Sequence, residues 1–189
     1  MTYQAIAFLG KILTPGSNVF EYGGGGSTLF CLDRGARVVT VEHDPEWLSL
    51  LTDKTRADHL SENWTGLLRQ PDRPPVPIPR DPSNPELYVS DDRDFDGLWF
   101  QNYAATIDDY ASIAFDVVIV DGRGRPSCIK HSVDKVRRGG YLVLDNTERS
   151  YYLQTDTMKY LINFRIVLDG YGPTPGATWF TETTIWQRI

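Results

Sequence analysis

The sequence is poor in cysteine, and its two cysteines are not arranged for a disulfide scaffold or a metal site. Cys31 and Cys128 are far apart in a chain of 189 residues, and each lies near a segment that we predict to be buried. Disulfide-rich domains and zinc sites need several closely spaced cysteines, so neither is expected. We predict that both are reduced thiols in or near the core.

The chain also has fewer basic than acidic residues. The chain has 19 Lys and Arg against 25 Asp and Glu, which gives a formal net charge of −6. Surfaces that bind nucleic acid or anionic membranes need clustered Lys and Arg. We therefore expect neither a nucleic-acid partner nor a membrane partner, although a small basic pocket is compatible with this composition.

Long hydrophobic runs are absent as well. The N-terminal segment 1–13 has no basic region, and Gln4, Gly10 and Lys11 interrupt its apolar residues, so it fits neither a signal peptide nor a membrane span. We expect a cytoplasmic protein. With 41% hydrophobic and 23% charged residues, the chain suits one globular domain over residues 1–189.

Alternating strand and helix patterns predict the fold class. A β-strand, helix, β-strand order implies parallel pairing with right-handed crossovers, hence an α/β fold with a mostly parallel central sheet and helices on both faces. The predicted strands are 19–22, 37–42, 64–69, 115–122 and 141–146. The predicted helices are 3–13, 27–35, 45–56, 103–112, 127–138 and 150–162, and the fifth of these is expected to stop at Gly139 and Gly140.

Two segments depart from this alternation. The strand-like segments 164–169 and 178–189 are joined by the short Gly/Pro-rich stretch 170–176, which is too short for a parallel crossover, so we predict a C-terminal antiparallel hairpin. Between Gln70 and Pro85 seven residues are proline. Proline removes backbone donors and disfavours helices and central strands, so we predict an irregular excursion at about 70–100.

Four consecutive glycines stand between the first predicted strand and the next helix, in 19-VFEYGGGGSTLF-30. Gly23 and Gly25 partly match the G-x-G-x-x-G turn that binds the pyrophosphate of NAD, but that pattern needs glycine where Thr28 stands. Glu21, directly before the turn, is a poor neighbour for a pyrophosphate and a better one for a cationic ligand. An NAD-dependent oxidoreductase is therefore the weakest of the alternatives.

Carboxylates follow four of the predicted strands. They are Glu21, Glu42 with His43 beside it, Asp121, and Asp145 with Asn146 beside it. Ligands of open α/β sheets bind at the carboxyl ends of the strands. Each residue alone also fits a helix cap or a turn, but the convergent set favours a ligand site at this edge.

Four motifs together resemble a known family. The segments 21-EYGGGGST-28, 40-TVEHDPEW-47, 115-FDVVIVDGR-123 and 139-GGYLVLDN-146 look like class I S-adenosylmethionine-dependent methyltransferases. The likeness is greatest to a bacterial group with E-Y/W-G-S-G-x-S-T and S-V-E-H-D-x-x-W motifs. It extends from about residue 5 to the C-terminus and implies a single Rossmann-like domain with S-adenosylmethionine as cofactor.

The resemblance also implies roles for individual residues. Gly23, Gly24 and Gly25 would pass beneath the methionine part of the cofactor, Glu21 would lie near its amino group, Glu42 would bind the ribose and His43 would lie beside the adenine. The cofactor-binding set further includes Ser27 and Thr28 at the start of the helix. For the acidic residue that often contacts adenine, the candidates are Asp91, Asp92 and Asp94, with a solvated acidic loop as the preferred alternative.

Asp121, Asp145 and Asn146 are similar to the magnesium site of catechol-type and caffeoyl-CoA-type O-methyltransferases, so Mg²⁺ is a candidate cofactor. Those enzymes have lysine three residues after the first aspartate, where this chain has Gly124. Without a metal, Asp121 is the candidate catalytic base, and His131 is a weaker one.

Arg123 and Arg125 are candidates for binding a carboxylate or phosphate of the substrate, with solvated loop arginines as the alternative. The predicted function is methyl transfer from S-adenosylmethionine to a small-molecule acceptor, preferentially at a hydroxyl oxygen. The main alternative is a non-catalytic module that binds S-adenosylmethionine or S-adenosylhomocysteine. The acceptor and the oligomeric state stay open.

Overall fold

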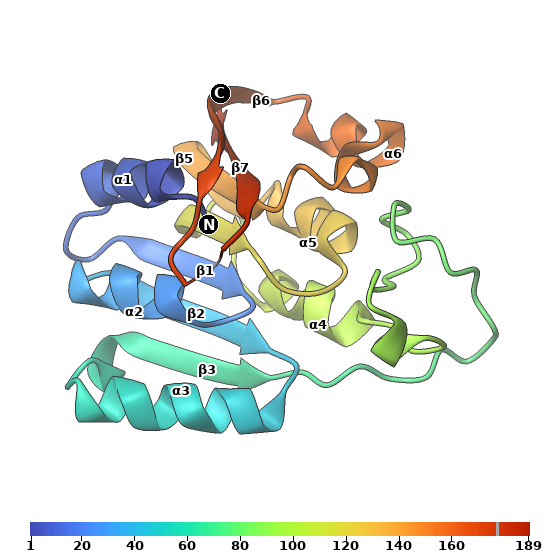
Figure 1. Cartoon of the computed structure of the whole chain (residues 1–189), viewed down its shortest axis with the longest axis horizontal. Coiled ribbons are helices and arrows are strands. Elements are labelled where there is room, and N and C mark those ends of the chain that lie inside the picture. The colour runs from blue at the N-terminus through green and yellow to red at the C-terminus, as the bar shows by residue number, and fades with distance from the viewer. Residues whose placement is uncertain (177) are drawn as a thin grey trace.

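A computed structural model describes residues 1–176 and 178–189 and contains one seven-stranded sheet. The strand order is β3-β2-β1-β4-β5-β7-β6 (Figure 1). The bounds are β1 Asn18–Tyr22, β2 Arg37–Glu42, β3 Trp64–Leu68, β4 Phe115–Val120, β5 Val136–Asp145, β6 Phe164–Pro173 and β7 Phe180–Arg188. Strands β1 to β5 pair in parallel, and β7 lies antiparallel between β5 and β6. The predicted Rossmann-like sheet and terminal hairpin are confirmed.

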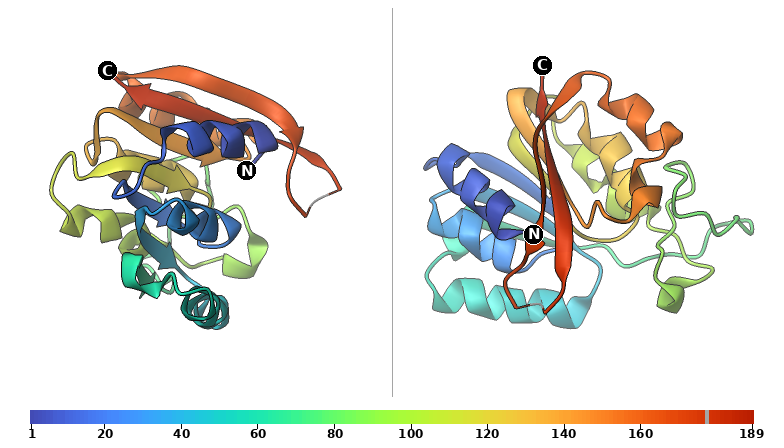
Figure 2. Two further views of the ribbon diagram at one scale, coloured as in Figure 1. Left: turned by 90° about the vertical axis from the view of Figure 1, so that its left-hand side faces the viewer. Right: turned by 45° about the horizontal axis from the view of Figure 1, so that its top comes forward.

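Helices cover both faces of the sheet, as the sequence predicts (Figures 1 and 2). The α-helices are α1 Tyr3–Ile12, α2 Gly26–Asp33, α3 Pro45–Ala57, α4 Gln101–Ala105, α5 Arg125–Ser132 and α6 Thr155–Met158. Short 3-10 helices are η1 Ser61–Asn63, η2 Arg93–Phe95, η3 Thr106–Asp109, η4 Ser150–Leu153 and η5 Lys159–Leu161. No helix in the described ranges is both long enough and apolar enough to cross a membrane.

Two hydrophobic clusters form the core, one on each face. Alternate side chains of a strand point to opposite faces, so in β1 Val19 joins the cluster under α1 and α2, whereas Phe20 joins the cluster under α4 and α5. Cys31 and Cys128 are buried free thiols, one in each cluster. The predicted position of both cysteines in the core is confirmed.

Three predicted helices differ from those observed. The helix expected over 103–112 is split into α4 and η3, and the one expected over 150–162 is η4, α6 and η5. Helix α5 ends at Ser132, and the pair that we predicted to stop it, Gly139 and Gly140, lies inside β5. A side chain at Gly140 would come within 2.8 Å of the Asp116 carbonyl oxygen, so this glycine allows β4 and β5 to approach across an irregular register.

Segment 69–92 contains no helix or strand among the described residues, as its prolines predict. One isolated bridge joins Asp72 to Trp99. Ion pairs and hydrogen bonds attach the excursion to the body, among them Lys130 with Glu86 and Arg149 with Asp91. The chain then returns to the sheet edge through η2, which brings its acidic residues to the site described below.

Candidate functional site

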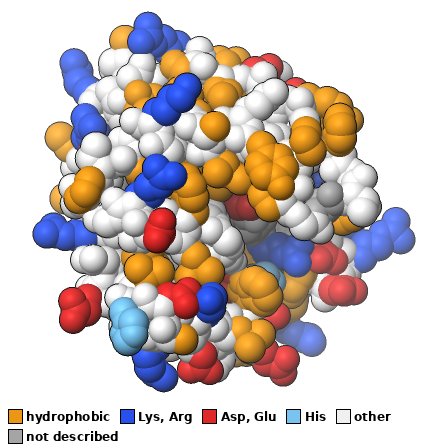
Figure 3. Space-filling model, turned by 60° about the vertical axis from the view of Figure 1, so that its left-hand side comes forward, with side chains coloured by type: hydrophobic (Ala, Val, Ile, Leu, Met, Phe, Trp, Pro, Cys, Tyr) orange, Lys and Arg blue, Asp and Glu red, His pale blue; other side chains and the backbone are white. Residues whose placement is uncertain are grey.

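A cavity of about 980 Å³ opens at the carboxyl ends of β1, β2 and β4. This is where the strand order reverses direction, because β2 and β4 flank β1 on opposite sides. Figure 3 shows the hollow, with charged side chains of both signs in and beside it and hydrophobic side chains around it. Its lining residues are Met1, Tyr3, Ile6, Gly23, Gly24, Gly25, Gly26, Ser27, Phe30, Glu42, His43, Asp44, Trp47, Asp92, Asp94, Phe95, Asp121, Gly122, Arg123, Arg125 and Pro175.

The first half of the glycine run is required by the protein itself. Gly23 has φ +82°, and a Cβ there would lie 2.7 Å from the Cα of Gly122 in the turn after β4. A Cβ at Gly24 would lie 2.6 Å from the Thr40 methyl group. These two glycines therefore let the turns after β1 and β4 and the strand β2 pack closely.

Gly25 and Gly26 have no such packing reason. A Cβ at Gly25 would meet only Trp47, at 3.9 Å, and one at Gly26 would meet nothing within 4 Å. Neither has a φ that excludes other residues. Both line the cavity at the start of α2, so the missing side chains leave room for a ligand rather than for another part of this chain.

Glu21 lies beneath the turn and is fully buried. The hydroxyls of Ser27, Thr28 and Thr40 all donate to its carboxylate, and Thr28 Oγ1 also accepts from the Gly25 amide at 2.9 Å. Burial raises the pKa of Glu21 to about 7, although these hydroxyls favour its ionised form. Glu21 is not among the cavity lining; it fixes the turn from below through Ser27 and Thr28.

Glu42 faces the cavity at the end of β2 and is 3% exposed. Its Oε2 accepts from the Gly24 amide at 3.1 Å, and Oε1 accepts from the amides of His43 at 2.7 Å and Asp44 at 3.1 Å. Burial opposes ionisation, but these hydrogen bonds and the His43 ring outweigh it, so the pKa of Glu42 is lowered. The site therefore holds a fixed, ionised acceptor in the cavity lining.

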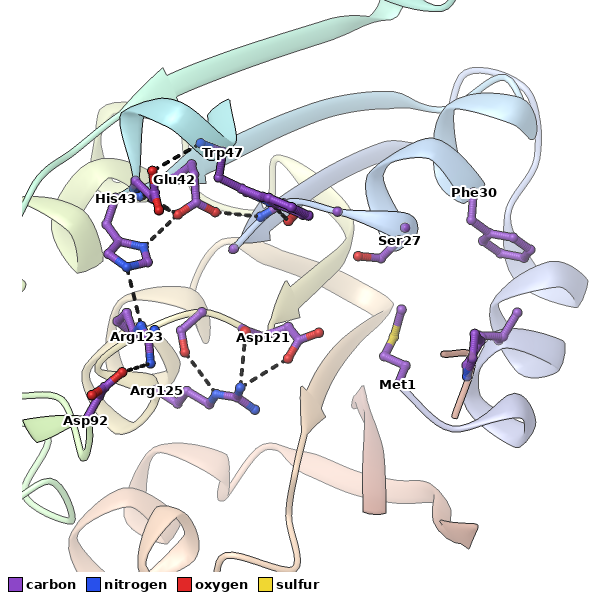
Figure 4. A pocket seen from close by; sticks show the side chains of 18 of the residues that line it. Met1, Ser27, Phe30, Glu42, His43, Trp47, Asp92, Asp121, Arg123 and Arg125 are labelled. Atoms are coloured by element: carbon purple, nitrogen blue, oxygen red, sulfur yellow. Dashed lines mark hydrogen bonds and ion pairs between the residues drawn. The ribbon is translucent and has the colours of Figure 1, made fainter. Parts of the chain in front are cut away.

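His43 is part of a contact chain across the cavity (Figure 4). Its Nδ1 lies 2.6 Å from Glu42 Oε1, and its Nε2 lies 3.4 Å from Arg123 Nε. Arg123 in turn pairs with Asp92 at 2.9 Å and lies over the Phe95 ring. The chain thus ties the ends of β2 and β4 to the excursion.

The excursion supplies two of the three candidate aspartates, and Phe95, which was not predicted, to the cavity lining. Asp92, Asp94 and Phe95 line the cavity, whereas Asp91 is turned away and bound by Arg149 and Tyr151. For these aspartates the sequence favours a solvated acidic loop. No local sequence pattern indicates this position, because η2 reaches the end of β2 only through the tertiary path of the excursion.

Asp121 and Arg125 form an ion pair at the end of β4, with Arg125 Nη2 3.1 Å from Asp121 Oδ1. Burial raises the pKa of Asp121 to about 6, although Arg125 opposes the shift. Arg125 is 7% exposed and also donates to the carbonyls of Gly122, Asp121 and Asp145. Arg125 therefore holds the ends of β4 and β5 together, and most of its donors are already used.

The three residues proposed for Mg²⁺ do not fit a metal site. Asp145 accepts from the Met1 amino group at 2.9 Å and the Thr183 hydroxyl at 2.6 Å. Asn146 donates to Thr181, and Asp121 faces the Arg125 guanidinium. Two cationic groups thus stand where a cation would have to bind, and within the described residues no group of three His, Cys, Asp or Glu could hold a metal ion. The hypothesis of a magnesium site is not supported.

His131 is remote from the cavity lining. Its Nδ1 lies 2.6 Å from Asp108, and its Nε2 lies 3.2 Å from the Tyr88 hydroxyl. Both contacts attach the excursion and η3 to α5. Phe100 and Tyr103 are fully buried and Tyr152 nearly so, in the core.

The fold is that of known methyltransferases. A putative methyltransferase from Streptococcus mutans in complex with SAH matches with a TM-score of 0.64 at 15% identity, covering 98% of this chain and 96% of that one. A methyltransferase-like protein from Silicibacter pomeroyi matches at 0.60 and 19% identity, covering 100% and 87%. A putative rRNA-methylase from Clostridium thermocellum matches at 0.64 and 11% identity, covering 98% and 94%.

Comparison of sequences adds nothing to this likeness, because no protein-family model and no curated protein matches the chain. At these identities the structural similarity establishes the fold.

Proposed function

We propose that the protein is an S-adenosylmethionine-dependent methyltransferase that acts on a hydroxyl oxygen of a small molecule. The observation that supports this most is the cavity between Gly25 and Glu42: an open glycine turn at a helix start, next to an ionised carboxylate that lines the same cavity. Ribose hydroxyls are donors that such a carboxylate binds. The motifs 21–28 and 40–47 that resemble methyltransferases form these two walls.

The charge of the cavity favours this cofactor over NAD. Glu42, Asp44, Asp92, Asp94 and Asp121 all line it. Such a lining attracts the sulfonium and amino groups of S-adenosylmethionine and repels the pyrophosphate of NAD. We assign Glu42 to the ribose, and His43 with Phe95 to the adenine, since their rings lie 5.2 Å apart at that end. Glu21, Ser27 and Thr28 act as positioning residues that fix Gly23 to Gly25.

When bound, S-adenosylmethionine supplies a methyl group whose bond to sulfur breaks as the acceptor oxygen bonds to it. Asp121 is the lining carboxylate next to the glycine turn that we assign to take the hydroxyl proton: Arg125 holds its Oδ1 in place, and burial, helped by the nearby Asp145 carboxylate, keeps its pKa raised. With a pKa of about 6 it is mainly ionised at neutral pH. Beyond this proton transfer, the chain orients the acceptor.

Two structural neighbours are named as rRNA methylases, but the charge of this chain argues against RNA as acceptor. The net charge is −6, and acidic residues dominate the cavity lining. RNA binding depends on neutralising phosphates with Lys and Arg. A small acceptor avoids this repulsion.

The test combines binding with turnover. Calorimetry with S-adenosylmethionine, S-adenosylhomocysteine and NADH should show binding of the first two only, and mass spectrometry should detect S-adenosylhomocysteine formation with hydroxylated acceptors. Binding of NADH alone would reject the proposal. Binding of the adenosyl ligands without turnover over a broad panel would instead identify a non-catalytic module. Chelation by EDTA should leave the activity unchanged, because no metal fits the site.

A further inference from the structure

The cavity has two chemically different ends. The charged end, already described, contains Glu42, His43, Asp92 and Arg123. The other end is built by Tyr3 and Ile6 of α1, Phe30 of α2 and Pro175 of the hairpin between β6 and β7. In Figure 4 Asp121 lies between the group that includes Glu42 and the end marked by Phe30 and Met1. A volume of about 980 Å³ is at the upper limit for one drug-sized ligand, so there is room for a second molecule.

Among the described lining residues, each cation already has a partner. Arg123 and Arg125 are the only Lys or Arg side chains among the described lining residues. Arg123 is paired with Asp92, and Arg125 with Asp121 and three carbonyls. The amino group of Met1 is held by Asp145. A carboxylate or phosphate on the acceptor would therefore meet the acidic lining uncompensated, which argues against our expectation that these arginines bind such a group.

The hairpin that supplies Pro175 also carries exposed aromatic side chains. Tyr171 is 59% exposed, Phe180 57% and Trp179 68%. The rings of Tyr171 and Phe180 are 5.9 Å apart on neighbouring strands. Figure 2 shows this end of the hairpin projecting beyond the body. Because Pro175 belongs both to the hairpin end and to the cavity, we define these three aromatics with Pro175 as the hairpin platform. Exposed apolar patches of this kind mark binding surfaces.

We propose that the methyl acceptor is an uncharged, predominantly apolar alcohol or phenol. Its apolar body lies against Tyr3, Ile6 and Phe30 and extends onto the hairpin platform, and its hydroxyl points to Asp121. The inference rests on the proposed function, because it names the substrate class of that same site. It excludes sugars, which offer too little apolar surface, and it excludes acceptors with a carboxylate or phosphate.

The test separates this inference from the proposed function by using binding as well as turnover. The probe is 2-naphthol, compared with 6-hydroxy-2-naphthoate, which adds one carboxylate to the same rings, and with glucose. Each is titrated by calorimetry into the full chain saturated with S-adenosylhomocysteine, and into the protein alone. 2-Naphthol should bind, the naphthoate should bind at least about tenfold more weakly, and glucose should show no binding. Turnover with S-adenosylmethionine should follow the same order.

Two variants test where the probe binds. Phe30→Ser and Trp179→Ser should each weaken 2-naphthol binding by about fivefold or more, with the affinity for S-adenosylhomocysteine unchanged. Ile162→Ser is the matched control, since Ile162 is 81% exposed and outside the cavity lining. Size-exclusion chromatography accompanies each variant.

The outcomes are distinct. Failure of the adenosyl ligands to bind would reject the proposed function. The affinity of 2-naphthol for the protein alone would still test whether the apolar end of the cavity binds an apolar phenol. Equal binding of the naphthoate, preferential binding of glucose, or unchanged affinity in both variants would overturn the inference. A change of oligomeric state in Trp179→Ser with unchanged probe affinity would show that the platform joins copies of the chain, and would also overturn it.

Discussion

The amide of Gly24 donates a hydrogen bond to Glu42 Oε2 across 3.1 Å. This bond joins the turn after β1 to the end of β2, and it fixes the carboxylate with one oxygen toward the cavity. The two amides of residues 43 and 44 hold the other oxygen. A carboxylate held in this way loses little entropy when a diol binds to it.

Glu42→Gln should weaken S-adenosylmethionine binding by about 1–3 kcal/mol, because a neutral amide replaces a charged acceptor. Calorimetry measures the change. Glu46→Gln is the control, since Glu46 is exposed on the following helix and outside the cavity lining. Equal affinities of the wild type and Glu42→Gln would contradict the assignment of the ribose to Glu42.

Gly25→Ala should abolish or strongly weaken cofactor binding while the free energy of unfolding stays within about 1 kcal/mol of the wild type, because the new methyl group has room in the protein but not beside a ligand. Gly172→Ala is the control, since a Cβ at this position in β6 would meet nothing within 4 Å, and it should change neither quantity. Gly23→Ala should instead lower the free energy of unfolding by about 2 kcal/mol or more, from its left-handed φ and its contact with Gly122. Urea unfolding and calorimetry distinguish the three, and normal cofactor affinity in Gly25→Ala would refute this interpretation.

Glu21 should give the stability an unusual pH dependence. Its pKa rises from 4.5 to about 7 on folding, so between these values the folded state binds more protons than the unfolded state. The contribution of Glu21 to the free energy of unfolding is therefore complete below pH 4.5 and decreases by up to about 3 kcal/mol as the pH rises to 7. Glu21→Gln should remove this decrease. Urea unfolding at several pH values measures this dependence. If the free energy of unfolding changed with pH equally in the wild type and in Glu21→Gln, the prediction would be contradicted.

Asp121 should control the pH profile of turnover. Because its pKa is raised to about 6, the carboxylate gains its proton as the pH falls through 6, and the rate should fall with it. Asp121→Asn should reduce kcat by about 100-fold or more and leave cofactor affinity nearly unchanged. Steady-state kinetics from pH 5 to 8 measure both. A rate that does not change between pH 5 and 8 in the wild type would show that another group takes the proton of the acceptor hydroxyl.

Substitution of the two arginines after β4 should affect different properties: Arg125 the stability, and Arg123 the affinity for the cofactor. Arg125→Gln should cost about 3–5 kcal/mol of stability, since it breaks a buried pair and leaves the ends of β4 and β5 untied. Arg123→Gln should cost less than about 1 kcal/mol, because that side chain is 33% exposed. Its effect should be a weaker affinity for the cofactor, through release of Asp92 and Phe95. Urea unfolding and calorimetry compare the pair, and equal stabilities would contradict the assigned difference.

Much of the fold follows from local sequence patterns. Buried β-branched runs such as 37–42, and a helix start marked by Asp44 and Pro45, depend on neighbours in sequence, and both were predicted correctly. The breaks in the helical segments were not, because 3-10 geometry in short polar turns is decided by what they pack against. The prediction that Gly139 and Gly140 end a helix was wrong for the same reason. A glycine that ends a helix and a glycine that allows a neighbouring strand to pack closely cannot be distinguished from the sequence.

The sequence by itself determined that carboxylates gather with a glycine turn at one edge of a parallel sheet, because strand direction and order fix where strand ends meet. Only the tertiary structure decided what each of them does. Glu21 is covered by three hydroxyls and Asp145 is taken by Thr183 and Met1, while Glu42 and Asp121 face the cavity. The partners that make this difference come from distant parts of the chain, and the free energy of burying a charge depends on those partners rather than on neighbours in sequence.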